Sequence, residues 1–216
     1  MIKKTDGGVT AAKGFEAIGI AAGIKKGKKD MALIYSRIPC EVAGTFTTNV
    51  VKAAPVKWDQ SVVYGGGSVH AVVVNSGVAN ACTGEEGLGY CKQTAEKAAE
   101  LFGIRADQVL VASTGVIGAQ IPIDKIRAGI ETMQPMLAHT QAAATLAAEA
   151  IMTTDTVKKE VVVELTLGGK TVTIGGMCKG SGMMQTGGGS CVRWDTLVCS
   201  LTRKRWISGS RAQPES

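Results

Sequence analysis

Residues 69–115 read VHAVVVNSGVANACTGEEGLGYCKQTAEKAAELFGIRADQVLVASTG. The apolar run Val69–Val74 at its start predicts a buried strand. Gly87–Phe102 is rich in Ala, Glu and Lys, with apolar positions three to four residues apart, which predicts an amphipathic helix that the next glycine ends. Val109–Ala112 predicts a second strand, which a turn at Ser113–Gly115 follows. The order of strand, helix and strand predicts an α/β fold.

The flanking sequence extends the same alternation on both sides. Upstream, Met31–Tyr35 and Gly44–Thr48 predict strands. Downstream, the sequence predicts two helices, one at Ile123–Leu137 (disturbed near Pro135) and one at Thr140–Met152. It then predicts a β-hairpin whose strands are Glu160–Leu167 and Thr171–Ile174 and whose turn is Gly168-Gly169. The Ala-rich second helix is expected to pack tightly against a neighbour. Together the elements predict an α/β sandwich with a mixed sheet.

Composition excludes a disordered chain but divides the sequence in two. Of 216 residues, 45% are hydrophobic and 19% are charged, which suits a packed core. Residues 184–216 show no helix or strand period and contain the basic cluster Arg203-Lys204-Arg205. This segment carries about half of the net charge of +6. We therefore predict an α/β domain over residues 1–183 and a disordered basic tail over 184–216.

Several classes of protein lack support in the sequence. No apolar stretch is long enough for a membrane span, and no signal peptide is read at the start, so we expect a cytoplasmic protein. No metal site is predicted, because His70 and His139 have no partner at ligand spacing. Free, buried thiols in a reducing cytosol are expected for the six scattered cysteines, which are Cys40, Cys82, Cys91, Cys178, Cys191 and Cys199.

Two glycine-containing segments fail as phosphate loops. Gly23–Lys29 has the wrong spacing and ends in lysine, and Gly87-Leu88-Gly89 lacks the third glycine of a dinucleotide fingerprint. The run Lys25–Lys29 is interpreted as a solvated loop before a strand, with a phosphate-contacting patch as the alternative.

Two other segments carry candidate chemistry. Ser113–Gly118 places small residues with backbone N–H groups after a strand, which suits an oxyanion hole or an ordinary turn. Lys179, flanked by small residues, is a candidate to hold a substrate carboxylate, or is a solvated charge. With two histidines, no Ser/His/Asp set is present. The sequence therefore fits a chemistry in which a base other than histidine activates the nucleophile, such as the amine of a processed N-terminus.

Taken together, seven segments resemble the ornithine acetyltransferase family of arginine biosynthesis. One departure inside them is Val78, where the family usually has Asn. The segments, in chain order, are Gly8–Phe15, Gly44–Asn49, Val51–Val56, Asn75–Gly84, Ser113–Gly118, Met152–Thr156 and Gly176–Met183.

The resemblance implies a self-processing fold, of which this sequence is the α-chain portion, and an activity. The family transfers acetyl from N-acetylornithine to glutamate, and some members also accept acetyl-CoA as donor. No cofactor is implied. Carried over by residue, Thr114 and Gly115 form the oxyanion hole, while Thr154 and Lys179 bind substrate. The implied partners are the β chain of the same precursor and further αβ pairs, with no membrane and no nucleic acid.

The resemblance stops after Met183. There the family continues Ile-His-Pro-Asn-Met-Ala-Thr and cuts before the threonine, which becomes the nucleophile. Ser190 falls at the threonine position here, within a sequence that does not match, and we interpret it as coincidence. A frameshift or truncated gene is the resulting hypothesis, with a chain inactive on its own. The alternatives are a catalytically dead remnant, a binding protein whose basic tail contacts nucleic acid, and a related self-processing aminopeptidase, whose motif set differs.

Overall fold

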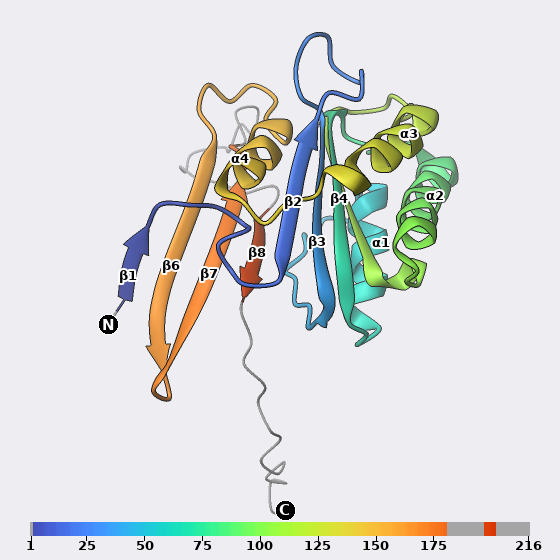
Figure 1. The fold of residues 1–216 in the computed structure, drawn as a ribbon. Coiled ribbons are helices and arrows are strands. Elements are labelled where there is room, and N and C mark those ends of the chain that lie inside the picture. Colours follow the sequence, from blue (N-terminus) through green and yellow to red (C-terminus); the bar gives the residue numbers. More distant parts are fainter. Residues whose placement is uncertain (1, 181–196, 202–216) are drawn as a thin grey trace, which may run out of the picture.

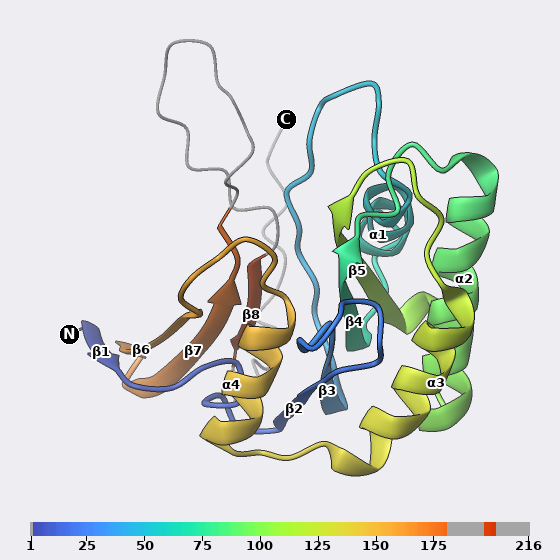
Figure 2. The same ribbon diagram turned by 90° about the horizontal axis from the view of Figure 1, so that it is seen from above.

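The computed structural model describes residues 2–180 and 197–201. Figure 1 shows two four-stranded sheets side by side, with helix α4 (Gln141–Ala150) between them. Viewed from above in Figure 2, the remaining helices cover the opposite face of one sheet. The predicted α/β sandwich with a mixed sheet is confirmed.

One sheet is mixed, and it contains the strand-helix-strand unit predicted for residues 69–115. Its order is β2-β3-β4-β5, with antiparallel neighbours except for the parallel pair β4 and β5. The parallel pair requires a crossover, which helix α2 (Gly84–Phe102) supplies. The strands are β2 (Phe15–Ile20), β3 (Met31–Cys40), β4 (Val69–Val78) and β5 (Val109–Val116).

The other sheet is antiparallel throughout, in the order β1-β6-β7-β8. The predicted hairpin forms its centre, because Gly168 and Gly169 both take positive φ (56° and 75°) in the two-residue turn. The strands are β1 (Ile2–Thr5), β6 (Lys159–Leu167), β7 (Lys170–Cys178) and β8 (Leu197–Leu201). Strand β8 lies within the predicted tail, whose disorder stays a prediction. The rest of that tail, Ser190 included, lies outside the described residues.

Each predicted helix is present, and α1 is additional. Gly103 ends α2 in the left-handed conformation, with φ 64°. The expected disturbance near Pro135 is a short 3₁₀ turn that follows α3. Thr140 caps α4 by accepting a hydrogen bond from the Ala143 N–H at 3.1 Å. The helices are α1 (Ala54–Tyr64), α2 (Gly84–Phe102), α3 (Ile123–Met133) and α4, with 3₁₀ turns at Ala106–Gln108 and Gln134–Met136.

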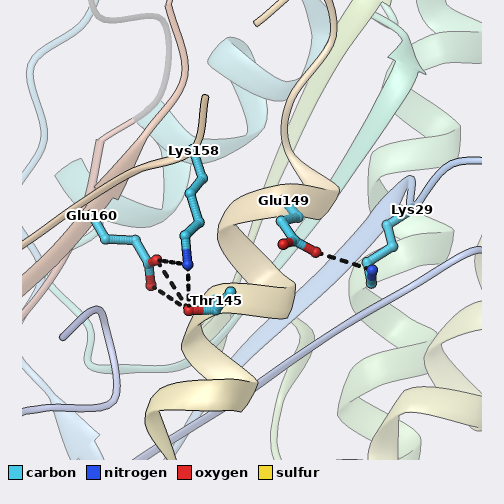
Figure 3. Close-up of polar contacts among 5 residues, drawn as sticks. All are labelled: Lys29, Thr145, Glu149, Lys158 and Glu160. Atoms are coloured by element: carbon cyan, nitrogen blue, oxygen red, sulfur yellow. Dashed lines mark hydrogen bonds and ion pairs between the residues drawn. The ribbon is translucent and has the colours of Figure 1, made fainter. Parts of the chain in front are cut away.

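Helix α4 packs tightly between the two sheets, as its alanines predicted. The small side chains Ala144, Ala147 and Ala148 are fully buried in a core that also contains Val74 of β4 and Met177 of β7. Figure 3 shows that polar contacts hold the helix on both sides. Toward β6, the Thr145 hydroxyl donates to a Glu160 carboxylate oxygen at 3.1 Å, and Lys158 contacts both residues; on the other side Glu149 pairs with Lys29 at 3.0 Å.

Two local predictions are wrong. Gly44–Thr48 forms no strand and lies in the loop between β3 and α1, because its β-branched residues have no strand to pair with. Ser113–Gly115 is not a turn: these residues continue β5, where they pair with Asn75–Gly77 of β4. Within the described residues, no helix has the length and apolarity to cross a membrane.

Candidate functional site

Thr114 and Gly115 lie at the carboxyl end of β5, next to the carboxyl end of the parallel strand β4. Thr114 pairs with Ser76, and Gly115 pairs with Gly77. Both glycines have positive φ, 138° at Gly115 and 114° at Gly77. A Cβ atom at Gly115 would overlap the backbone of Gly77. The two strand ends therefore approach at a distance that only glycine allows.

The outer edge of β5 is covered by side chains rather than by another strand. Asp59 of α1 accepts a hydrogen bond from the Val111 N–H at 2.9 Å, and the Trp58 indole N–H donates to the Val109 carbonyl at 2.9 Å. Backbone groups along a strand point alternately to its two sides. The Gly115 N–H consequently belongs to the same open edge as the Val111 N–H, beyond the part that α1 covers.

The loop after β4 supports the end of β5. The Ala79 N–H donates to the Val116 carbonyl at 2.8 Å, and the Gly118 N–H donates to the Ala81 carbonyl at 2.9 Å. Asn80 is fully buried with φ 48°, and its side chain donates to the Gly87 carbonyl at 2.9 Å. Because this loop is anchored from inside, it fixes the backbone beside Thr114 and Gly115.

Asp155 connects the segment that carries Thr154 to the residue that follows Lys179. Thr154 is exposed in the segment after α4, whereas Lys179 follows β7 and is 4% exposed. The Asp155 carboxylate accepts hydrogen bonds from the Gly180 N–H at 2.7 Å and from Lys159 at 2.6 Å. Burial raises the pKa of Asp155, but the hydrogen bonds from Lys159 and Gly180 outweigh it, so the pKa lies below its ordinary value. The Lys179 ammonium donates to the Gly180 carbonyl at 2.9 Å.

Two hydrogen bonds reach the end of α4 and the segment after it, one from the end of β4 and one from the connection between β2 and β3. The Ser76 hydroxyl, opposite Thr114, donates to the Ala150 carbonyl at 2.5 Å. The Lys25 ammonium donates to the Met152 carbonyl at 2.6 Å. These bonds connect neighbours of the predicted site residues: Ser76 pairs with Thr114, and Met152 precedes Thr154 by two residues.

Asp30 was not predicted from the sequence as part of this region, and Lys25 was interpreted as a residue of a solvated loop. Asp30 is fully buried and accepts backbone N–H bonds from Ala22, Ile24 and Lys25 at 2.6 to 2.8 Å. Lys25 is partly buried, and burial lowers its pKa although the Asp30 charge opposes this. The solvated interpretation of the lysine run therefore fails for Lys25. The one sequence signal was the position of Asp30 directly before a buried strand.

The described cysteines are unpaired by disulfides and differ in burial. Among the described side chains, Cys40, Cys82, Cys91 and Cys178 form no disulfide. Cys91 is buried, but Cys82 is exposed in the loop before α2, so the expected burial is wrong there. Residues 2–180 hold no group of three or more His, Cys, Asp or Glu side chains suited to a metal ion.

The fold is similar to those of acetyltransferases of arginine biosynthesis whose crystal structures are known. A crystal structure of the arginine biosynthesis bifunctional protein ArgJ from Bacillus halodurans matches with a TM-score of 0.81 and 42% identity, covering 87% of this chain and 97% of that one. Ornithine acetyltransferase from Mycobacterium tuberculosis, solved in complex with ornithine, matches with a TM-score of 0.80 and 40% identity, covering 92% of this chain and all of that one.

Sequence comparison identifies the family. The ArgJ family model matches residues 16–191. The arginine biosynthesis bifunctional protein ArgJ of Gloeobacter violaceus is 50% identical over 202 residues, which are 93% of this chain and 49% of that protein. The protein of the same name from Symbiobacterium thermophilum is 52% identical over 181 residues, 82% of this chain and 44% of its own length. The chain belongs to the ArgJ family, and it spans about half the length of these curated relatives.

Proposed function

We propose that this chain supplies part of an active site that transfers acetyl from N-acetylornithine to glutamate, giving ornithine and N-acetylglutamate. The observation that carries the proposal is the close pair Gly77 and Gly115 at the ends of two parallel strands, beside Thr114. Membership of the ArgJ family and the likeness to an ornithine acetyltransferase solved with ornithine support it. A role in arginine biosynthesis would place the protein in the cytoplasm.

Thr114 and Gly115 are proposed to stabilise the oxyanion of the tetrahedral intermediate. Attack on the acetyl carbonyl converts its oxygen into an anion, and donors fixed in advance stabilise that charge without reorganising. The Gly115 N–H belongs to the open edge of β5, and the Thr114 hydroxyl comes from the neighbouring position. The donor positions are held by strand pairing, which suits this role.

Thr154 and Lys179 are proposed to bind the amino-acid substrate. Both N-acetylornithine and glutamate carry an α-carboxylate, for which a partly desolvated ammonium is a strong partner. Lys179 is nearly buried, and its ammonium donates a hydrogen bond to the Gly180 carbonyl. The exposed Thr154 adds a hydroxyl on the open side of the same segment.

The nucleophile and the partner chain complete the proposal. In the family mechanism a threonine freed by self-cleavage takes the acetyl group and passes it to glutamate, its own amine serving as base. We propose a β chain and an assembly of αβ pairs as partners, with acetyl-CoA as a further acetyl donor. Ser190 and the predicted division at residue 183 fall at or beyond the edge of the described residues, so both stay predictions.

The test combines the full chain with the part of the Gloeobacter violaceus relative that this chain does not span. The two are co-expressed, and acetyl transfer from N-acetylornithine to labelled glutamate is measured. Transfer should depend on both polypeptides, and Lys179→Met should weaken substrate use in the complex. Lys170→Met, which removes an exposed lysine at the start of β7, is the control. A folded complex that transfers no acetyl, or that is indifferent to Lys179→Met, would contradict the proposal.

A further inference from the structure

Side chains of helix α1 form hydrogen bonds with the backbone at the edge of β5. Two consecutive side chains, Trp58 and Asp59, contact alternate residues of the strand: the indole N–H donates to the Val109 carbonyl, and the carboxylate accepts from the Val111 N–H. A neighbouring strand would offer this same pairing of donor and acceptor. The helix therefore satisfies the strand edge with side chains, and this pattern ends four residues before Gly115.

Among the described residues, the Asp59 carboxylate accepts the hydrogen bond from Val111 without a neighbouring cation to balance its charge. Within residues 2–180, no lysine, arginine or histidine forms an ion pair with it. Helix α1 packs on α2 and β5, and the titratable side chain facing Asp59 from them is Cys91 of α2. Burial, and then the Asp59 charge, raise the pKa of Cys91 to about 12, so this thiol stays neutral near neutral pH. The carboxylate is consequently held by the backbone of β5.

We propose that Asp59 is a positioning residue for the end of β5, and that its acceptor oxygen fixes the edge on which the Gly115 N–H lies. The proposal rests on the proposed oxyanion role of Gly115. The Val111, Ser113 and Gly115 N–H groups belong to the same edge of one strand, so a shift at the first is transmitted along the backbone. A hydrogen bond to a charged acceptor is shorter and stronger than one to a neutral acceptor.

A consequence is that the strand end responds to pH. Burial raises the pKa of Asp59 to about 7, although the bond from the Val111 N–H opposes this. As the pH rises through this value, Asp59 becomes ionised and its bond to Val111 tightens. Below it, the neutral acid holds the strand more weakly.

The test follows backbone amide signals of the isotopically labelled full chain by NMR, from about pH 5 to about pH 9. The Val111 amide signal should move with a midpoint of about 7, and the Gly115 amide should follow with the same midpoint. Asp59→Asn keeps an acceptor for Val111 and removes the charge, so both midpoints should disappear in a folded protein.

Two controls separate the role of this carboxylate from general effects. Trp58→Phe removes the indole N–H but should leave the titration of both amides in place. Asp107→Asn alters an exposed carboxylate just before the same strand, one that pairs with Arg105, and should also leave it in place. A Gly115 amide that does not move while Val111 titrates, or that still titrates in Asp59→Asn, would overturn the proposal.

Activity gives a second and separate measurement. In the complex with the relative's remaining half, Asp59→Leu should lower kcat by about 10- to 100-fold with KM little changed, because a small misplacement of a donor affects the transition state. An unchanged kcat would contradict the positioning role. If the parent complex transfers no acetyl at all, the proposed function fails, and the amide measurement still decides the role of Asp59.

Discussion

The two halves of the candidate site are held by different forces. Thr114 and Gly115 are fixed by backbone pairing between β4 and β5, where two glycines meet without room for a side chain. Thr154 and Lys179 lie outside strands and are held through the carboxylate of Asp155. Steric contact does not depend on pH, whereas an ionic contact does. A side chain added at Gly115 should therefore disrupt the first half at every pH, whereas the contacts of Asp155 in the second half should weaken as this carboxylate is protonated in acid.

The largest effect is expected for Gly115→Ala. The new Cβ would overlap the Gly77 backbone, and φ 138° is unfavourable for alanine, so we expect more than about 3 kcal/mol of destabilisation. In the proposed complex, misplacing this donor should also lower turnover by about 10²- to 10³-fold. Urea unfolding and the acetyl-transfer assay measure the two effects.

Gly89→Ala is the matched control for this substitution. Gly89 lies in α2, and nothing stands within 4 Å of its added Cβ. Alanine should stabilise the helix there by about 0.5–1 kcal/mol. Equal stability of Gly115→Ala and the parent would show that the strand ends do not depend on the close approach.

Asp155→Ala tests the half of the site that contains Thr154 and Lys179. This change leaves the Gly180 N–H and Lys159 without their acceptor, at a cost of about 1–3 kcal/mol. Because the folded pKa of Asp155 is lowered, its contribution is present above an unfolded pKa of about 4 and is lost as the pH falls below it. Melting temperatures across this range should converge in acid and separate at neutral pH. A constant difference at every pH would contradict an ionic role.

The connection between the halves is tested by Ser76→Ala. Its hydroxyl bonds the Ala150 carbonyl within the core, so its loss should cost about 1 kcal/mol. Chemical denaturation measures this, with Ser61→Ala as control, because the Ser61 hydroxyl bonds within an exposed part of α1. If the two substitutions change the free energy of unfolding equally little, the hydrogen bond between Ser76 and α4 does not contribute to stability.

The smallest effect is expected for the ion pair between Lys29 and Glu149 in Figure 3. Both side chains are more than a third exposed, so solvent screens their attraction. A double-mutant cycle with alanine at both positions should give a coupling of about 0.2–1 kcal/mol that decreases with added salt. A coupling well above this range would mean that the pair, rather than the buried alanines, holds this side of α4.

Elements with strong periodicity were predictable from the sequence. The apolar runs gave β3, β4 and β5, and the Ala-rich amphipathic pattern gave α2 and α4. Helix α1 was missed because Pro55 lies in its first turn and its apolar residues are spread around the helix rather than confined to one face. Ser113–Gly115 looked like a turn because its small residues favour one, but pairing with β4 keeps it extended.

The candidate site was less predictable than the fold. Local residue types made Ser113–Gly118 and Lys179 candidates with alternatives open. The family resemblance added Thr154 and the role of each residue, and no local pattern gave their spatial relation. The carboxylates of Asp30, Asp59 and Asp155 could not be found from the sequence, because each is identified by the backbone N–H groups that it accepts. For Asp59, that group lies more than fifty residues away in the chain.

The most direct test of the central claim is a titration of the full chain with N-acetylornithine, followed by the backbone amide signals of Gly115 and Gly180. If strand end and loop form one site, both signals should shift together with a single dissociation constant, and Lys179→Met should weaken both equally. Shifts with two different constants, or a response of one half alone, would contradict the single site.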